Sequence, residues 1–471
     1  LFSVRCSLCF VYLRFNYNNK LFFMYNIILI NPPVYDFTYF NLWEKPLGLL
    51  NLASAFVADE RCRVHFIDCV PERLKKKSEY DRGAGKLTGV RTDKPECFKT
   101  IKRNFHRYGI GIGELEERLL KIKSGIKPGE PSAVLIGAMM TYWYMGAFEA
   151  AAAARRVMPQ AAVALGGIYA RLAPEHAGRS GLFDYIETGF DVFAIRENIL
   201  KILNVTAPGC GRSCGSLIPA YHLLEELNNS VSLATSTGCP YRCSYCASGV
   251  LYPRYSVKPA AAIVEELSYY KTALGVKNAA FYDDALLYKK EENFYRWADE
   301  WIKTGGGIDF HLPNAAHASM IDEKCAAVMK AAGFKTVRLG YEFYDKKKQD
   351  AASGGKVSGA VLKRAVANLK KEGFNAGDIG VYILFGHPAC DIVETANAVD
   401  FVFDCGATPG LSLYSPIPRT PDAEAVFAQN PEILSEPLLQ NKTVFFQLYS
   451  GIDYGQYYDL KTRIQRLRSA G

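Results

Sequence analysis

The chain has 471 residues, of which 49% are hydrophobic, and a formal net charge of +8. This length suits two or three domains, and this composition is typical of a globular protein, which excludes a largely disordered chain. The basic residues are scattered except for short lysine runs at residues 75–77 and 346–348, which favours solvated faces over a nucleic-acid-binding patch. Thirteen cysteines and no secretory signal indicate a reducing, cytoplasmic location rather than a disulfide framework.

Residues 1–23 precede the first methionine, Met24. This segment is apolar but is interrupted by charged and amide side chains, so it matches neither a membrane-spanning helix nor a signal peptide. We interpret it as a translated upstream extension and expect the protein to start at Met24. We expect no membrane span in the rest of the chain.

Strands and helices alternate between residues 24 and 205. Residues 26–31 form a continuous apolar run that ends at Pro32, as expected of a buried parallel strand. A polar, basic insertion is predicted at residues 71–131. Further strands are predicted at residues 63–68, 133–137, 162–167 and 183–189. The alternation predicts a doubly wound, Rossmann-like α/β domain, whose ligands would lie beyond the carboxyl ends of the strands.

A glycine-rich linker follows at residues 206–230. It contains Cys210 and Cys214, which we interpret as free thiols because two cysteines alone cannot hold an iron–sulfur cluster.

The most specific motif is Cys239-x3-Cys243-x2-Cys246, on a predicted loop. Thiolates are soft ligands that favour zinc, copper(I) or iron–sulfur clusters. Zinc sites usually show four ligands in paired spacings, whereas three close cysteines would leave one iron of a [4Fe–4S] cluster free. A zinc knuckle and three reduced, buried cysteines are the alternatives.

This spacing, with Tyr245 before the last cysteine, resembles the signature of the radical S-adenosyl-L-methionine (SAM) superfamily. The resemblance implies that Cys239, Cys243 and Cys246 hold a [4Fe–4S] cluster and that the fourth iron binds SAM. An electron from the cluster would cleave SAM to a 5′-deoxyadenosyl radical, which abstracts hydrogen from a substrate. The resemblance also implies an electron donor such as a flavodoxin or ferredoxin.

Six strand–helix repeats are predicted between residues 231 and 420. Their strands are predicted at residues 231–236, 278–284, 308–313, 335–342, 379–386 and 410–414. The alternation predicts a parallel sheet with right-handed crossovers, and six units predict a partial (βα)6 barrel of the TIM type, which resembles the radical SAM core. The chemistry of such barrels lies at the carboxyl ends of their strands.

Polar residues at those strand ends are the candidate site residues. The resemblance implies a SAM site formed by Tyr245, Asp283, Asp284 and Glu342. Candidates for contact with substrate or SAM are His311, Asn314, His387 and Tyr414. The alternatives are structural: a helix cap for the aspartates, an ion pair with Arg338 for Glu342, and satisfied polar groups for the others. No residue stands out as a catalytic acid or base.

The first domain resembles the cobalamin-binding domain that precedes many radical SAM barrels. The stretches that carry this resemblance are residues 30–33, 46–49 and 165–168. Candidate cobalamin contacts are Asn31, Pro32, Gly166 and Gly167. The Asp-x-His-x-x-Gly motif of methionine-synthase-type domains does not follow the first strand, so no such histidine would bind cobalt. The alternative is a cofactor-free domain that packs on the barrel.

Residues 421–471 are predicted to form a helical cap over the barrel or the substrate mouth. The leading interpretation is a radical SAM enzyme that transfers a methyl group, with cobalamin, to an unactivated centre of a small molecule. Cobalamin-independent cyclisation or rearrangement is the second interpretation, and a zinc-binding α/β module without activity is the third. Sulfur insertion into RNA would need a second three-cysteine motif upstream, which the sequence lacks.

Overall fold

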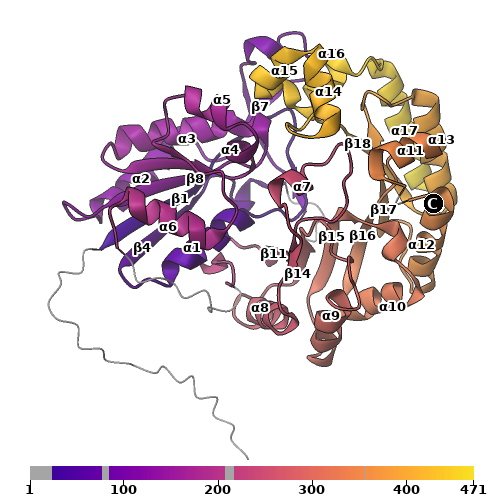
Figure 1. Ribbon diagram of the computed structural model, residues 1–471, viewed down its shortest axis with the longest axis horizontal. Helices are drawn as coiled ribbons and strands as arrows, with labels where there is room; N and C mark the ends of the chain where they lie inside the picture. Colours follow the sequence, from indigo (N-terminus) through magenta and orange to yellow (C-terminus); the bar gives the residue numbers. More distant parts are fainter. Residues whose placement is uncertain (1–23, 77–83, 207–216, 356, 471) are drawn as a thin grey trace, which may run out of the picture.

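The computed structural model describes residues 24–76, 84–206, 217–355 and 357–470, and shows two α/β units side by side (Figure 1). The extension at residues 1–23 and the cysteines Cys210 and Cys214 lie outside the described residues, so the predictions on them stay predictions. Among the described residues, no helix combines the length and apolar character that a membrane crossing requires.

The first unit contains a five-stranded sheet in the order β10–β9–β8–β1–β4, and all of its pairs are parallel. Its strands are β1 (Tyr25–Asn31), β4 (Cys62–Asp68), β8 (Ser132–Gly137), β9 (Ala162–Gly166) and β10 (Tyr185–Ile186). Its helices are α1 (Leu47–Val57), α2 (Ile112–Ser124), α3 (Tyr144–Val157), α4 (Ile168–Leu172), α5 (Pro174–Arg179) and α6 (Val192–Ile202). The predicted doubly wound domain is confirmed.

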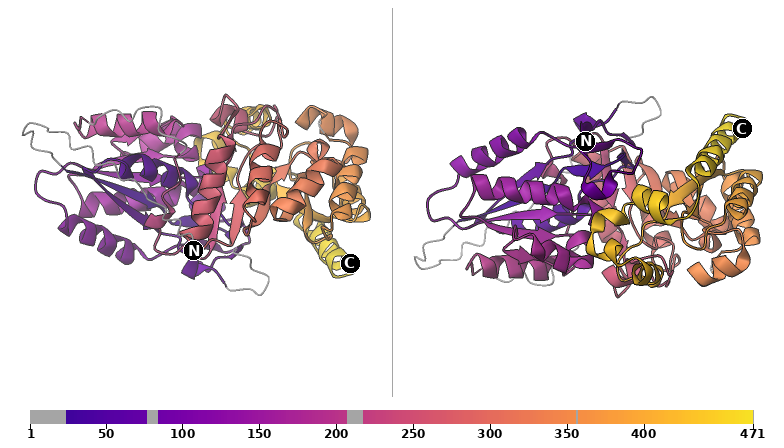
Figure 2. Two further views of the ribbon diagram at one scale, coloured as in Figure 1. Left: turned by 90° about the horizontal axis from the view of Figure 1, so that it is seen from below. Right: turned by 90° about the horizontal axis from the view of Figure 1, so that it is seen from above.

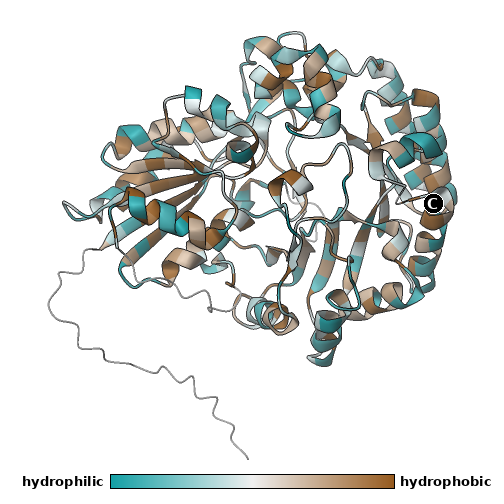
Figure 3. Cartoon of the chain, viewed as in Figure 1, coloured by the Kyte–Doolittle hydropathy of each residue, from teal (hydrophilic) through white to brown (hydrophobic). Residues whose placement is uncertain are grey.

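The central strand explains why both faces of this sheet are covered. Side chains alternate along a strand, so an all-apolar strand needs a hydrophobic layer on each side. Ile27 and Leu29 of β1 pack with α1 and α6, whereas Ile28 and Ile30 pack with α2 and α3. Figure 3 shows hydrophobic residues along the strands of this sheet and hydrophilic residues on the outer faces of the helices.

The predicted insertion at residues 71–131 is only partly irregular. Its end forms α2, whose buried Leu115 and Leu119 belong to the core, so the interpretation of these residues as a polar insertion was wrong. The polarity of the exposed face hid a helical spacing of apolar residues. The rest contains three short strands: β5 (Gly85–Lys86), β6 (Val90–Thr92) and β7 (Phe105–Tyr108). Strand β7 pairs antiparallel with β6 and with β2 (Val34–Asp36), and β5 pairs antiparallel with β3 (Phe40–Asn41); β2 and β3 both precede α1.

The second unit is built on a six-stranded parallel sheet in the order β11–β14–β15–β16–β17–β18. The strands are β11 (Ser230–Leu233), β14 (Asn278–Phe281), β15 (Asp309–Ala316), β16 (Phe334–Gly340), β17 (Ile379–Phe385) and β18 (Thr408–Leu413). Among the described residues the two outer strands, β11 and β18, do not pair with each other, so the barrel is open. This confirms the predicted partial (βα)6 barrel.

Helices follow the barrel strands and cover the outer side of the sheet (Figure 1). They are α8 (Ala260–Thr272), α9 (Phe294–Lys303), α10 (Glu323–Ala332), α11 (Lys346–Ser353), α12 (Gly359–Lys371) and α13 (Ile392–Asp404). Phe281, Phe310 and Phe334 from three adjacent strands meet beneath them, with ring centroids 5.1–5.4 Å apart. Such aromatic contacts add about 0.5–1.5 kcal/mol per pair beyond the burial of surface. Before α8 lie the short α7 (Ser248–Leu251) and the strands β12 (Ser236–Thr237) and β13 (Ser256–Val257).

The C-terminal segment contains α14 (Pro421–Gln429), α15 (Pro431–Ser435), α16 (Lys442–Tyr449) and α17 (Tyr454–Ala470). Figure 2, seen from above, shows part of this yellow segment between the two units. Thr141 Oγ1 of the first unit donates to Gln440 Oε1 at 2.6 Å, and Asn441 Nδ2 donates to Asp36 Oδ1 at 3.0 Å. The segment therefore joins both units and does more than cap the barrel.

We expect Asp36→Ala to lower the free energy of unfolding by about 2–4 kcal/mol. Asp36 is only 2% exposed, and its carboxylate also accepts hydrogen bonds from Trp143 Nε1 at 2.9 Å and Phe37 N at 2.6 Å. Its loss would leave three donors without this acceptor, and two of them, Phe37 N and Asn441 Nδ2, belong to buried residues. Denaturant unfolding of the full chain measures the change. The exposed Asp299→Ala in α9 is the control, and a loss below about 1 kcal/mol for Asp36→Ala would contradict the assignment.

Candidate functional site

Three cysteine thiols lie on the loop between β12 and α7. Cys239, Cys243 and Cys246 line one cavity, whose volume is about 360 Å³. The loop turns back on itself, because Cys246 N donates to Cys243 O at 3.1 Å. Burial raises the pKa of the Cys239 thiol to about 11, so this group keeps its proton unless a metal centre displaces it.

The spacing of these thiols bears on the kind of metal centre. Among the described residues, no three His, Cys, Asp or Glu side chains are placed to hold a single metal ion. A zinc ion needs its ligands around one point, within about 2.0–2.3 Å of the metal. A [4Fe–4S] cluster takes one thiolate per iron, so its ligands stand further apart. Three thiols that line one cavity are compatible with one thiolate on each of three irons.

Four residues predicted to contact SAM or substrate line the same cavity: Tyr245, Asp284, Asn314 and Glu342. They come from the cysteine loop and from the carboxyl ends of β14, β15 and β16, the edge at which barrel enzymes bind their ligands. Burial raises the pKa of Asp284. The four predicted residues thus lie together, and their contact with SAM or substrate stays a prediction.

Tyr245 and Glu342 hold each other at the cavity wall. Tyr245 Oη donates to Glu342 Oε1 at 2.7 Å, and Gln349 Nε2 of α11 donates to Glu342 Oε2 at 2.7 Å. Burial, and then the negative charge of Glu342, raise the pKa of Tyr245 well above its ordinary range. The alternative of an ion pair between Glu342 and Arg338 is not what the structure shows, since Arg338 Nη1 donates to the carbonyls of Val337 and Asp378.

Asp283 requires a correction, because it points away from the cavity. The side chain is 2% exposed and accepts hydrogen bonds from the backbone N–H and hydroxyl groups of Thr235 and Ser236, at 2.5–3.1 Å. Burial raises the pKa of Asp283, and these donors oppose that rise. The carboxylate anchors the chain just before β12, so we assign it a structural role in place of the predicted SAM contact.

His311 is also placed differently from the prediction. Its Nδ1 lies 3.0 Å from Thr336 Oγ1 and its Nε2 lies 2.9 Å from Asn278 Oδ1. Its ring stacks on Trp43 of the first unit, with centroids 4.0 Å apart. His311 does not line the cavity, so the structural alternative describes it better than contact with substrate or SAM.

His387 and Tyr414 form a pair beside the barrel sheet, with ring centroids 4.7 Å apart. His387 Nε2 lies 3.0 Å from Asp422 Oδ2 of α14. Neither ring belongs to the lining of the cavity, so direct contact with substrate is not supported by their placement.

Sequence reasoning overlooked several residues of the cavity wall. The wall also contains Tyr241, Tyr288, His317, Met320 and Tyr382. The rings of Tyr241 and His317 lie 4.5 Å apart, on two different strand-end loops. Tyr382 could have been found from the sequence, because it is the only polar side chain within the apolar sequence of β17. The loop residues carry no comparable periodicity.

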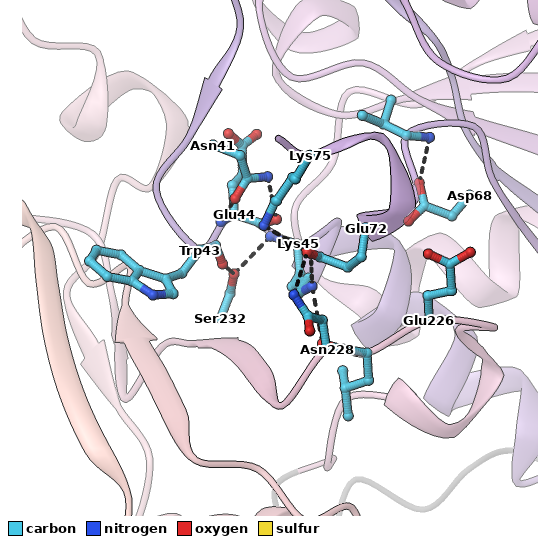
Figure 4. Close-up of polar contacts among 12 residues, drawn as sticks. Asn41, Trp43, Glu44, Lys45, Asp68, Glu72, Lys75, Glu226, Asn228 and Ser232 are labelled. Carbon is cyan, nitrogen blue, oxygen red and sulfur yellow. Dashed lines mark hydrogen bonds and ion pairs between the residues drawn. The ribbon is translucent and has the colours of Figure 1, made fainter. Parts of the chain in front are cut away.

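The carboxyl edge of the first sheet holds a second, smaller cavity of about 40 Å³ (Figure 4). Asn31 and Pro32, predicted to contact cobalamin, line it, whereas Gly166 and Gly167 do not. The buried Lys45 pairs with Glu72, and Lys75 Nζ lies 2.9 Å from Glu72 Oε2. Burial lowers the pKa of Lys45.

A short segment crosses from this edge to the barrel. Lys45 N donates to Ser232 Oγ at 2.9 Å, and Ser232 Oγ donates to Trp43 O at 3.0 Å (Figure 4). Tyr282 Oη donates to Leu42 O at 2.8 Å. A cavity of this size holds a few water molecules, and a corrin ring is many times larger. Cobalamin would fit here only after residues that line the cavity, such as Asn41, Glu44 and Lys45, had moved, so we derive no reaction step through it.

Comparisons with known proteins agree with this geometry. Residues 233–399 match the model of the radical SAM superfamily. The fold resembles that of TsrM, a radical SAM methyltransferase from Kitasatospora setae, in a structure with cobalamin and a [4Fe–4S] cluster bound. The TM-score is 0.59 at 16% identity, over 86% of this chain and 78% of that chain. A second TsrM structure, with tryptophan and a SAM analogue, gives a TM-score of 0.60 at 16% identity, over 86% and 76% of the chains.

One curated relative is called an uncharacterized methyltransferase, PH0819, from Pyrococcus horikoshii. It is 29% identical over 133 residues, which is 26% of this chain and 28% of the relative. The match thus spans little more than a quarter of that protein's length.

We expect Glu44→Gln to stabilise the protein at pH 8 and to have little effect at pH 5. Glu44 lines the smaller cavity, and burial raises its pKa from 4.5 to about 7. A carboxyl whose pKa is raised in the folded state costs stability as the pH rises from the unfolded value through the folded one. The gain at pH 8 should be about 1–3 kcal/mol.

Denaturant unfolding of both proteins at the two pH values measures this difference. The control Glu60→Gln removes an exposed carboxylate of the same unit and should change stability by less than about 0.5 kcal/mol at either pH. An equal effect of Glu44→Gln at pH 5 and pH 8 would show that its carboxylate is not held in this way.

Proposed function

Since residues 233–399 of this chain form a radical SAM domain, we propose that the protein is an enzyme that binds a [4Fe–4S] cluster and cleaves SAM reductively. The observation that carries the proposal is the meeting of three thiols and two carboxylates, those of Asp284 and Glu342, on one cavity at the carboxyl ends of the barrel strands. Cys239, Cys243 and Cys246 would hold three irons. The fourth iron would be left for SAM.

The cavity offers groups suited to a charged nucleoside. When bound, the cluster supplies the electron that splits SAM into methionine and a 5′-deoxyadenosyl radical. Asp284 and Glu342 can accept hydrogen bonds from an ammonium group or from ribose hydroxyls, and Asn314 can both donate and accept. Met320 and Val357 provide apolar wall beside them. These roles follow from the chemistry of the side chains that line the cavity.

The reductant would be a flavodoxin or ferredoxin, which we propose because each turnover consumes an electron that this chain does not supply. We also propose a cytoplasmic location. Its support is the set of nine cysteines in the described residues, all of which are free thiols, as expected in a reducing compartment.

The finer proposal is methyl transfer to an unactivated carbon or phosphorus centre of a small molecule, with cobalamin as methyl carrier. The fold similarity to TsrM and the name of the Pyrococcus relative support it. It requires that residues 41–45 leave the sheet edge. The second candidate is cobalamin-independent cyclisation or rearrangement, in which the radical acts directly on the substrate. The small size of the edge cavity favours this candidate.

We expect Cys243→Ala to abolish cluster binding. Anaerobically reconstituted wild type should contain about four irons per chain and form 5′-deoxyadenosine from SAM with dithionite. The variant should hold less than about one iron and lose 5′-deoxyadenosine formation at least about 100-fold, because a cluster held by two thiolates is not retained. The control Cys405→Ala removes a free thiol that does not line the cavity and should match wild type. Zinc without iron in reconstituted wild type would overturn the proposed function.

Cobalt analysis separates the two candidate reactions. After incubation with hydroxocobalamin and gel filtration, about one cobalt per chain would support the methyl carrier, and the rate of product formation should then depend on cobalamin. Iron with 5′-deoxyadenosine formation and no cobalt would support the cobalamin-independent reaction. The variant Trp43→Ala, which loosens the segment at the sheet edge, should bind cobalamin more readily than wild type if residues 41–45 control entry.

A further inference from the structure

We propose that Asp422 and His387 are positioning residues, which hold the cysteine loop in place through Ser244 and so set the properties of the cluster. This inference rests on the proposed function, because it concerns the same cluster. Both side chains lie outside the cavity wall, so they act on the site through another residue.

Ser244 stands between Cys243 and Tyr245, and its polar groups are all bound to residues from other parts of the fold. Its Oγ donates to Asp422 Oδ2 at 2.7 Å, and its carbonyl accepts from Asp422 N at 3.2 Å. Its backbone N–H donates to Ala352 O of α11 at 2.9 Å. Ser244 is thus held by α14 on one side and by α11 on the other. A residue that is fixed in this way fixes the cysteine beside it.

Asp422 receives its second hydrogen bond from His387. Ala389 N donates to His387 Nδ1 at 3.1 Å, so in the neutral ring Nε2 carries the proton and donates to Asp422 Oδ2 at 3.0 Å. The imidazole is also wedged between aromatic rings, since Phe343 and Tyr414 meet it edge-on at 5.6 Å and 4.7 Å. The ring orientation of His387 therefore aims the Asp422 carboxylate at Ser244.

The turn that presents His387 is itself constrained. Gly386 has φ +76°, and a Cβ at this position would lie 3.0 Å from the Phe446 ring. Any other residue would be strained there and would press on α16. The backbone at the end of β17 thus fixes the position of the His387 imidazole.

A carboxylate so close to the cluster loop also has an electrostatic effect. The reduction potential of an iron–sulfur cluster depends on nearby charge and on hydrogen bonds, and a nearby negative charge makes reduction harder. Asp422 therefore has two separable effects: it orients the loop through hydrogen bonds, and it lowers the potential through its charge. Isosteric and truncating variants separate them.

The test compares Asp422→Asn, Asp422→Ala, His387→Gln and His387→Ala in the reconstituted full chain. The control is Glu424→Gln on the same helix, whose exposed carboxylate accepts from Arg419 N at 3.0 Å. The readouts are iron content, the midpoint potential of the cluster, its EPR spectrum with and without SAM, and the rate of 5′-deoxyadenosine formation. Thermal unfolding midpoints check that each variant folds.

We expect Asp422→Ala to slow 5′-deoxyadenosine formation about 10- to 100-fold, to raise the midpoint potential and to change the EPR spectrum. Asp422→Asn should raise the potential as well, but keep more of the rate, because its amide oxygen can still accept from Ser244. His387→Gln, which keeps a donor, should stay within about 5-fold of wild type, whereas His387→Ala should approach Asp422→Ala. Glu424→Gln should match wild type in all readouts.

The inference is overturned if Asp422→Asn and Asp422→Ala fold and show the wild-type potential, spectrum and rate. Should Asp422→Ala fail to fold, the isosteric Asp422→Asn decides through its potential and spectrum. Failure of the proposed function is distinguishable, because wild type itself would then bind no iron. If wild type binds four irons and the Asp422 variants match it in potential, spectrum and rate, the positioning role is refuted and the proposed function is not.

Discussion

The loop that carries Cys239, Cys243 and Cys246, called the cluster loop here, starts at a point that one buried carboxylate, that of Asp283, holds in place. It follows β14 and collects the backbone N–H and hydroxyl groups of Thr235 and Ser236, which follow β11. If one of these four donors were buried without an acceptor, the protein would lose about 1–3 kcal/mol of folding free energy. Two adjacent strands are therefore joined at their carboxyl ends, and Cys239 leaves from this fixed point three residues later. Asp283 itself is not part of the lining of the cavity that the three cysteines share.

The other end of the loop is held by contacts of a different origin. Tyr245 is bound through Glu342 and Gln349 to α11, and Ser244 is bound to α14, so the loop is gripped by elements more than 90 residues away in sequence. Helix α14 belongs to the C-terminal segment, which Asp36 and Thr141 attach to the first unit. The first unit, the C-terminal segment and the cluster loop thus form one connected framework. The loop is therefore held both by contacts within the barrel unit and by the segment that joins the two units.

The sequence predicted the parts of this structure that periodicity or spacing determines. The apolar run of β1, the six barrel strands and the three cysteines are local patterns, and all were identified. The failures share a cause. Residue types at a strand end show that polar groups gather there, but the partner decides which way each one turns. Asp283 and Asp284 are adjacent, yet one faces Thr235 and the other faces the cavity. Asp422 and Ser244 are 178 residues apart, and no local pattern joins them.

The placement of His311 shows how the first unit contributes to the barrel. The sequence suggested that this histidine contacts substrate or SAM, but both of its nitrogens bond within the sheet and its ring stacks on Trp43. The same short segment reaches Ser232 of β11 and Tyr282 at the end of β14. Three neighbouring barrel strands are therefore contacted by residues 42–45 alone, at the sheet edge where a doubly wound domain ordinarily binds its ligand. At this edge the residues that would surround a ligand instead contact the barrel, and the space left beside them is a cavity of about 40 Å³.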